Sequence, residues 1–292
     1  MSETPIIRAM TRTEVDQLVD WAALEGWNPG LRDADIFWLT DPDAFIAAEF
    51  EGELIGGGAI AAYGDGFGFL GFFIVRPEYR GRGFGRKLWR ELRERLAARL
   101  RPDATSGLDG VFAMQPHYAR DGFVFSHRDI RFRVELSRAP EQQDEDAQPD
   151  LLVPLEQIPV DEILDYDRRC FPAPRERFLR AWIRQPGGYA FGYHQNGDLR
   201  GFGVARRCRE GYKIGPLFAD NGKIADALLR KLIQSVAVGP IFLDVPENNP
   251  AAVELAHAHQ MVEVFGCARM HEGPTPQVDH SRIFGVTTFE FG

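Results

Sequence analysis

Glycines at three alternate positions make residues 81–85 the stretch of this chain best suited to bind an anion. Basic residues stand between and beside them, an apolar run at 72–75 leads into them, and a helical pattern follows. A strand, a glycine-rich turn and a helix N-terminus present backbone N–H groups to a phosphate, and glycine lets the backbone approach it closely. We therefore predict a site for a phosphorylated cofactor made by Arg80, Gly81, Arg82, Gly83, Phe84, Gly85 and Arg86, with Lys87 as a further cation.

Two common phosphate-binding motifs do not fit this stretch. A P-loop requires Gly-Lys-Ser/Thr, but Gly85 is followed by Arg86, and a dinucleotide fingerprint would need a third glycine where Arg86 stands. The pattern that remains is Arg80-x-x-Gly83-x-Gly85 behind Val75-x-Pro77. It resembles the acetyl-CoA pyrophosphate loop of the GNAT N-acetyltransferases, in which Q/R-x-x-G-x-G/A follows a central strand.

The resemblance implies acetyl-CoA as the co-substrate and assigns roles to further residues. The central strand would splay from its neighbour, so that the backbone of Phe73, Ile74 and Val75 pairs with the pantetheine arm and directs an N–H group at the thioester oxygen. Tyr118 begins a Tyr-x-x-x-Gly-Phe stretch that is similar to a family motif whose tyrosine protonates the leaving thiolate. A phenol with a pKa near ~10 suits that role, and the structural alternative is a tyrosine packed against Phe123.

The general base is less clear, because residues 66–75 contain no acidic side chain. The base could come from elsewhere, water could relay the proton, or the acceptor could be something other than an ordinary ammonium. Candidates are Glu25, Asp33 and Asp35, which follow the first predicted helix; in the family that region lines the acceptor pocket. Trp27, Asn28 and Asp33 are the predicted substrate-binding residues, and the alternative is an ordinary turn at a helix C-terminus.

Composition excludes several classes of protein. The chain has 292 residues and a net charge of −9, whereas nucleic-acid-binding proteins usually carry a basic excess. No apolar run is long enough to span a membrane, and the start of the chain has no signal-peptide pattern. Three scattered cysteines predict neither disulfides nor a zinc or other metal site, and they indicate a cytoplasmic protein.

Residues 138–150 are polar and acidic, and they read as a linker between two halves of similar length. We predict domains at 1–137 and 151–292, each mixed α/β (α+β) with a central, mostly antiparallel twisted sheet flanked by helices. In the first half, helices are expected at 13–24 with Thr13 as the N-cap, at 84–100 and at 117–120, and strands at 44–50, 53–62, 66–75, 110–114 and, as a pair, within 123–136.

The second half repeats this order of elements. Helices are expected at 156–166, 176–182, 224–236 and 249–259, and strands at 189–194, 199–205, 212–218, 240–245 and 262–270. The residues at 215–220 and 243–246 look like the C-terminal domain of a tandem GNAT family. The loop at 219–223 has one glycine and no arginine, and Asp220 or Asn221 reads as a helix N-cap, so we predict a degenerate domain without cofactor.

The function expected from these observations is acetyl-CoA-dependent N-acetyl transfer to a small-molecule amine, by direct attack in a complex that holds both substrates. No cysteine nucleophile is expected, because Cys170, Cys208 and Cys267 all follow the linker. Two alternatives stay open: a CoA-binding regulatory or scaffold protein with little activity, and an acyltransferase for a different acyl group. The expected assembly is a monomer or homodimer, without nucleic acid, membrane or metal.

Overall fold

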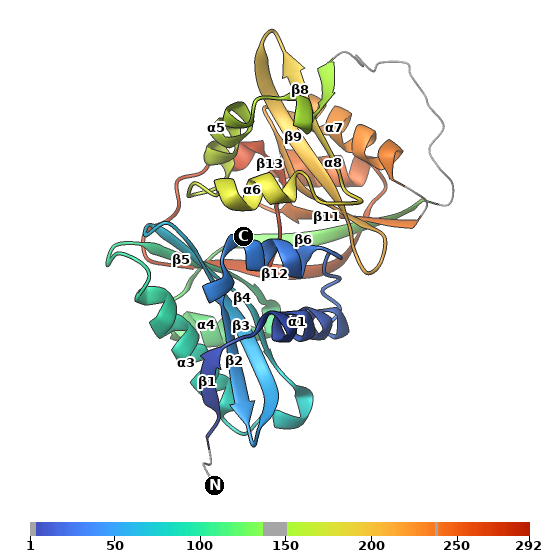
Figure 1. The fold of residues 1–292 in the computed structure, drawn as a ribbon. Coiled ribbons are helices and arrows are strands. Elements are labelled where there is room, and N and C mark those ends of the chain that lie inside the picture. The colour runs from blue at the N-terminus through green and yellow to red at the C-terminus, as the bar shows by residue number, and fades with distance from the viewer. Residues whose placement is uncertain (1–3, 137–150, 237–238) are drawn as a thin grey trace.

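The computed structural model describes residues 4–136, 151–236 and 239–292; the predicted linker at 138–150 lies outside them. Two lobes, one for each half of the sequence, share one mixed sheet (Figure 1). Within the described residues the strand order is β1-β2-β3-β4-β5-β12-β6-β11-β10-β9-β8-β7, with β13 paired to β10. Most neighbouring pairs are antiparallel, so the predicted mixed α/β class is confirmed.

The first half contains the helices α1 (Arg12–Leu24), α2 (Asp33–Thr40), α3 (Phe84–Ala97) and α4 (Gln115–Arg120) and the strands β1 (Ile6–Ala9), β2 (Phe45–Phe50), β3 (Glu53–Tyr63), β4 (Phe67–Val75), β5 (Thr105–Val111) and β6 (Val124–Leu136). The N-cap of α1 is Thr11 rather than Thr13, because Thr11 and Glu14 form a capping box. Helix α2 was not predicted: it has only eight residues, and its Phe37 stacks on Trp182 of the second half.

Two further predictions in the first half need correction. The strand expected at 110–114 lies earlier, at Thr105–Val111, and Phe112–Met114 is a 3₁₀ turn. Residues 124–136 form one long strand rather than two, because the partners of β6 come from the other half of the chain. Helix α3 ends one turn before the predicted residue 100.

The second half contains the helices α5 (Val160–Cys170), α6 (Glu176–Trp182), α7 (Gly222–Ser235) and α8 (Pro250–Ala258) and the strands β7 (Leu152–Pro154), β8 (Tyr189–Gln195), β9 (Asp198–Arg207), β10 (Tyr212–Ala219), β11 (Gly239–Pro246), β12 (Val262–Glu272) and β13 (Ile283–Gly285). Helix α5 begins four residues later than predicted, after a 3₁₀ turn at Leu155–Gln157. From β1 to β6 and from β7 to β12 the order of helices and strands is identical, so the predicted repeat is confirmed.

The two halves exchange their last strands. Strand β12 pairs with β5 of the first half, and β6 pairs with β11 of the second half. The exchanged strands also pair with each other and cross the middle of the molecule (Figure 1). Backbone hydrogen bonds therefore join strands of the two halves into one sheet, and each half contributes a strand to the sheet of the other.

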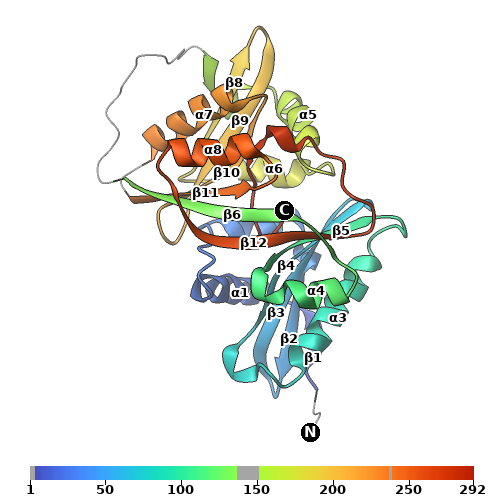
Figure 2. The same ribbon diagram turned by 180° about the vertical axis from the view of Figure 1, so that it is seen from behind.

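Helices cover both faces of the sheet. Helices α1, α2, α5 and α6 lie on the face seen in Figure 1, and their buried side chains form one core that both halves share. On the opposite face, α3 and α4 cover the first half, and α7 and α8 cover the second half, each pair with its own core (Figure 2). No helix in the described ranges has the length and apolarity to cross a lipid bilayer.

Candidate active site

The strand before the glycine loop leaves its neighbour halfway along. Strands β4 and β5 are paired only from Phe67 and Thr105 to Leu70 and Leu108. Beyond this point β4 contains a bulge, in which Phe72 and Phe73 oppose the single residue Gly58 of β3, and Phe72 has φ of 51°. A positive φ in a bulky residue stores strain that only the surrounding packing can hold in place. The splay and the bulge together re-aim the backbone of residues 72–75.

The loop that follows leads into a helix whose N-terminus has no side-chain cap. Gly81 and Gly83 have φ of 77° and 83°, which explains glycine at both positions. Gly83 is the N-cap of α3, and among the residues that the structure describes no side chain accepts the first N–H groups of the helix. Gly85 differs, because its φ is ordinary and a Cβ atom there would lie at van der Waals distance, 3.5 Å from Val75 and 3.7 Å from Phe73. Neither backbone nor packing therefore requires glycine at position 85.

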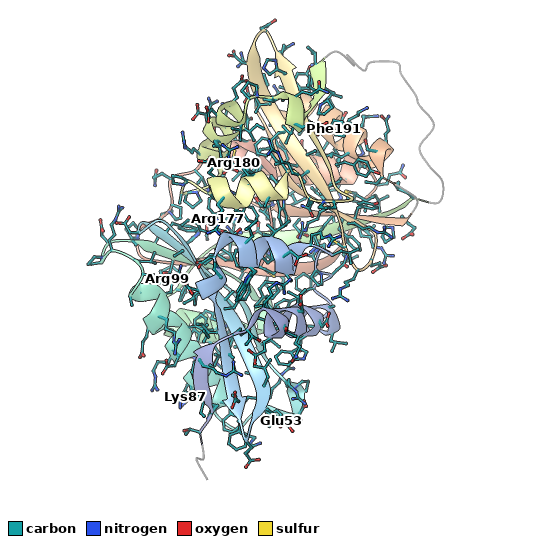
Figure 3. All side chains as sticks on the ribbon, in the orientation of Figure 1. Glu53, Lys87, Arg99, Arg177, Arg180 and Phe191 are labelled. Atoms are coloured by element: carbon teal, nitrogen blue, oxygen red, sulfur yellow. The ribbon has the colours of Figure 1, made fainter. Side chains whose placement is uncertain are left out.

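The basic residues of the loop have different surroundings. Arg80 donates from Nε to the carbonyl of Val75 at 2.7 Å and pairs with Glu25. The guanidinium of Arg82 lies 4.6 Å from the ring centre of Phe84, and Arg86 is exposed without an ionic or hydrogen-bond partner in the parts of the chain described. Lys87 instead donates to the carbonyl of Pro5 at 2.7 Å and lies beside the start of β1 (Figure 3). Because Lys87 is held by Pro5, Arg80, Arg82 and Arg86 are the loop cations that could contact an anion bound there.

Tyr118 is held in place from both sides. Its ring packs on Trp89 with 5.0 Å between centres, and only 7% of the residue is exposed. A Cβ atom on Gly110 would overlap the ring, so the glycine in β5 makes room for the tyrosine. The hydroxyl has no hydrogen-bond partner among the residues described. Burial raises the pKa of Tyr118 above 10, which keeps the phenol protonated at neutral pH.

The three carboxylates named as candidate bases all have arginine partners. Glu25 pairs with Arg80, and Asp35 is exposed and bonds Arg12 at 2.5 Å. Asp33 is fully buried; it accepts from the N–H of Gly30 at 2.7 Å and from Arg206 of β9 at 3.2 Å. Each of the three carboxylates therefore already takes part in an ion pair.

The residues predicted to bind substrate join the two halves. The carbonyl of Trp27 accepts from Arg131 at 2.7 Å and from Lys213 at 3.2 Å, and Asn28 exchanges two hydrogen bonds with the backbone of Glu210. They border a set of buried charges that we call the inter-half cluster, which consists of Asp33, Arg131, Arg206, Lys213, Asp244 and Glu290.

Ion pairs organise most of the inter-half cluster. Arg131 and Asp244 form a bidentate pair at 2.6 and 2.8 Å, and the guanidinium holds the pKa of that carboxyl below its usual range. Burial lowers the pKa of Lys213. Sequence reasoning missed the cluster, because its members come from α2, four strands and the segment 286–292. The available signal was a charged residue inside an apolar strand, as with Arg131 between Ile130 and Phe132.

Strand exchange also corrects the argument about cysteines. Cys267 follows the linker, but β12 places it opposite Val111 of β5, next to Gly110, on which the ring of Tyr118 packs. Position in the sequence therefore does not exclude this thiol. Its chemistry does so instead, because burial raises the pKa of Cys267 well above 9 and keeps the sulfur protonated and weakly nucleophilic.

The second half has the same bulge and splay, but its own chain fills the gap. Strand β10 pairs with β11 only at residues 212–214, and Gly215 and Pro216 form a bulge opposite Val204. Strand β13 then pairs with β10, and the N–H of Val286 donates to the carbonyl of Asp244 in β11 at 2.8 Å. The N-cap of α7 is Asn221, one of the two predicted residues, and its side chain accepts from the N–H groups of Lys223 and Ile224. This helix N-terminus is already satisfied.

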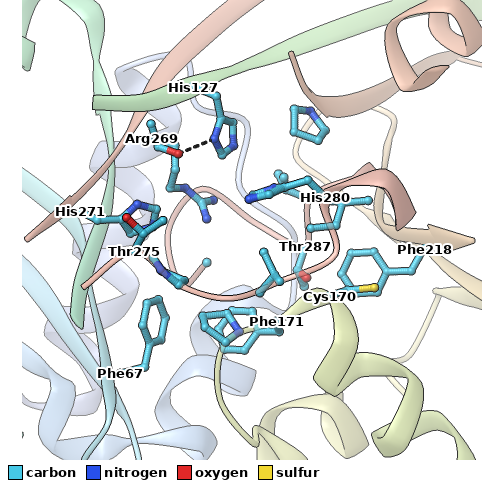
Figure 4. A pocket seen from close by; sticks show the side chains of 18 residues that line it. Phe67, His127, Cys170, Phe171, Phe218, Arg269, His271, Thr275, His280 and Thr287 are labelled. Carbon is cyan, nitrogen blue, oxygen red and sulfur yellow. Dashed lines mark hydrogen bonds between the residues drawn. The ribbon is translucent and has the colours of Figure 1, made fainter. Parts of the chain in front are cut away.

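A small cavity lies between the halves near the start of β4. Its volume is about 50 Å³, and its lining includes Phe67, His127, Arg269, His271 and His280 (Figure 4). Burial lowers the pKa of His271 to about 3, so this imidazole is neutral. In the ranges that the structure covers, no three His, Cys, Asp or Glu side chains are grouped to hold a metal ion.

Known proteins resemble this chain in both halves. The protein-family model described as "Acetyltransferase (GNAT) family" matches residues 12–110. A second family model, described as "Acetyltransferase (GNAT) domain", matches residues 163–285. Holothin acyltransferase of Pseudoalteromonas sp. (strain SANK 73390) is 27% identical over 94% of this chain and 90% of its own length.

Solved structures share the fold. That of a candidate acetyltransferase from Pyrococcus horikoshii is 26% identical, with a TM-score of 0.82 over 100% of this chain and 97% of the other. A tandem GNAT protein from the clavulanic acid biosynthesis pathway is 15% identical, with a TM-score of 0.61 over 93% of this chain and 99% of its own, and shows the fold alone. With a GNAT match in each half and the same order of elements in both, this chain belongs to the GNAT superfamily and is a two-domain GNAT acyltransferase.

Proposed function

We propose that the protein transfers an acetyl group from acetyl-CoA to the amine of a small molecule, and that the reaction takes place in the first half. The observation that carries this assignment is the difference between the two splayed strand pairs. In the first half the splay of β4 from β5 stands beside an uncapped helix N-terminus with unpaired Arg86. In the second half β13 and Asn221 occupy the corresponding positions.

The backbone of the first half supports each step of the transfer. The N–H groups at the start of α3, with Arg80, Arg82 and Arg86, would bind the pyrophosphate. The bulged residues Phe73 and Ile74 would pair with the pantetheine arm and polarise the thioester carbonyl. As the amine attacks and the C–S bond breaks, Tyr118 would give its proton to the thiolate.

Direct attack in a complex of both substrates is favoured over a covalent enzyme intermediate, because the nearby Cys267 is held as a thiol. We expect a small acceptor, since the related protein is named for acyl transfer to holothin, a small molecule, and matches nearly all of this chain. The acyl group is the open variable, because the name of that relative specifies an acyl and not an acetyl group.

Thiol release from acetyl-CoA, measured over a panel of small amines, tests the function. We expect amine-dependent release, and we expect Tyr118→Phe to lower kcat by about a hundredfold or more while the Kd for acetyl-CoA stays within a factor of two. His117→Gln, on the exposed side of the same helix, is the matched control. Binding of acetyl-CoA without release to any amine would contradict the proposal, and faster release from longer acyl-CoAs would correct its acyl group.

A further inference from the structure

The segment after β13 places the backbone of another acidic residue, Glu290, against β4. Residues 286–292 run between the halves, and the carbonyl of Phe291 accepts from the hydroxyl of Tyr63 at 2.7 Å. A Cβ atom on Gly71 would collide with the backbone carbonyl of Glu290. Gly71 directly precedes the bulge at Phe72, where β4 has left β5. The backbone of Glu290 therefore lies next to the bulge of β4, close to the residues expected to bind the thioester.

The side chain of Glu290 is buried and only half satisfied. The residue is 2% exposed, and its Oε2 accepts from the hydroxyl of Thr288. Its Oε1 is buried without a hydrogen-bond partner in the described parts of the chain. A buried carboxylate oxygen without a partner is costly unless a ligand supplies a donor. The charges of the cluster explain how the carboxylate is tolerated, since it acts on Arg131, Arg206 and Lys213.

A second buried polar atom of the inter-half cluster also lacks a hydrogen-bond partner among the described residues. Nη2 of Arg206 has no partner among the described residues, although Nε bonds Asp33 and Nη1 bonds the carbonyl of Thr287 at 3.4 Å. Within this cluster only Oε1 of Glu290 and Nη2 of Arg206 are both buried and unpartnered. The first needs a hydrogen-bond donor and the second needs an acceptor.

Resting on the function proposed above, we propose that the inter-half cluster is the acceptor site and that Glu290 accepts the proton of the attacking amine. The acceptor class is a small amine with a carbonyl or carboxylate oxygen close to the nitrogen, since these groups satisfy Glu290 and Arg206 respectively. The nitrogen forms a bond to the thioester carbon and gives one proton to Glu290. The C–S bond breaks, and the sulfur takes the proton of Tyr118. After product release Glu290 loses its proton to solvent and Tyr118 regains one.

This assignment divides the active site between the halves. The first half would hold the cofactor and the acid Tyr118, and the second half would supply Glu290 and Arg206. Oε1 of Glu290 and Nη2 of Arg206 are both shielded from solvent, so the acceptor reaches them by a local shift of residues 286–292. That segment is irregular beyond β13 and is held to the first half by Tyr63.

Glu290→Gln tests the proton-acceptor role, because it keeps the size of the side chain and a partner for Thr288. We expect kcat at pH 7 to fall by about a hundredfold to a thousandfold, with the Kd for acetyl-CoA within a factor of two of wild type. The remaining rate should rise as the pH increases from 7 to 9, since more of the amine is then free without a base. Glu247→Gln, an exposed carboxylate paired with Arg128, is the control and should match wild type.

The outcomes separate this inference from the proposed function. Amine-dependent release by wild type, with Glu290→Gln within threefold of it and an unchanged pH profile, would overturn the role of Glu290 alone. No release by wild type would contradict the proposed function. If Glu290→Gln does not fold, as judged by circular dichroism, Glu290→Asp replaces it. That variant keeps the charge, and we expect a kcat at least tenfold lower with the wild-type pH profile; a wild-type kcat would overturn the role.

Arg206→Lys tests the acceptor class. Glycinamide and ethylamine differ in the carbonyl group, and after correction for the fraction of free amine we expect wild type to favour glycinamide in kcat/KM by at least tenfold. Lysine preserves the charge toward Asp33 but lacks Nη2, so the preference should fall below threefold, mainly through KM. Equal use of both amines by wild type, or an unchanged preference in the variant, would reject the assignment of Arg206.

Discussion

Single residues in the glycine loop divide into those that shape the backbone and one that leaves space. Gly81 and Gly83 have positive φ, which explains them without any ligand. Gly85 has an ordinary φ and room for a methyl group, yet it lies in the first turn of α3. A residue that the fold does not require is best explained by close approach of a bound group. The sequence showed the three glycines, but only the dihedral angles distinguish them.

A pair of alanine variants separates these two roles. Gly85→Ala should raise the free energy of unfolding by about 0.5–1 kcal/mol, because alanine is the better helix residue, and should weaken acetyl-CoA binding at least tenfold. Gly83→Ala should lower the free energy of unfolding by about 1 kcal/mol, because its φ is 83°. Chemical denaturation and calorimetric titration measure the two quantities. Unimpaired binding by Gly85→Ala would remove the argument from that residue.

At the scale of elements, the proposed site depends on two strands that change partners. Strand β4 leaves β5 after Leu70, and β12 enters between β5 and β6. The apolar pattern predicted both as strands, and their existence is confirmed. Their neighbours were not predictable, because alternation reports which face of a strand is buried and not which strand lies beside it. For the same reason the apolar pattern predicts two short strands where the structure has the single strand β6.

The half-buried His271 of β12 makes the stability of the protein depend on pH. Burial lowers the pKa of His271 to about 3, whereas an unfolded chain binds a proton there near pH 6.5. The unfolded state thus binds more protons below pH 6.5, and the stability present above that pH is lost as the pH falls. The contribution is about 1.4 kcal/mol for each pH unit between about 6.5 and 3.

His271→Gln should make the free energy of unfolding less dependent on pH between 6.5 and 5. Urea unfolding at half-unit intervals of pH measures the slope, and His117→Gln on the exposed face of α4 is the control. A variant that loses stability with acid as steeply as wild type would show that His271 is not the group that titrates.

At the scale of the whole molecule, the halves form one structure. They exchange β6 and β12, share the core under α1, α2, α5 and α6, and join through the bidentate pair of Arg131 and Asp244. The repeat of elements followed from the sequence, but an ordinary reading of the linker suggests two independent sheets. The sequence pattern cannot predict the exchange of β6 and β12, because a strand can pair with a neighbour from its own half or from the other half.

The exchange predicts how the halves behave when they are separated. With a protease site introduced at 138–150, the cleaved chain should stay together in size-exclusion chromatography and keep its acetyl-CoA affinity, since backbone hydrogen bonds and a buried core hold it. Residues 1–136 expressed alone should lack cooperative unfolding, because β5 would lose β12. Cooperative unfolding of that fragment with bound cofactor would show instead that the first half is independent.

The sequence by itself determined the family, the repeat and the glycine-rich turn between a strand and a helix, because these follow from short-range patterns: residue types at fixed spacings along one strand, turn or helix. The roles of the glycine loop and of Tyr118 stay predictions. The tertiary structure alone decided which half supplies each part. It brought Cys267 opposite Val111 of β5, filled the second splay with β13, and set the backbone of Glu290 against Gly71. Those contacts join residues far apart in the chain and are fixed by the packing of the exchanged strands. Local spacing in the sequence therefore cannot predict them.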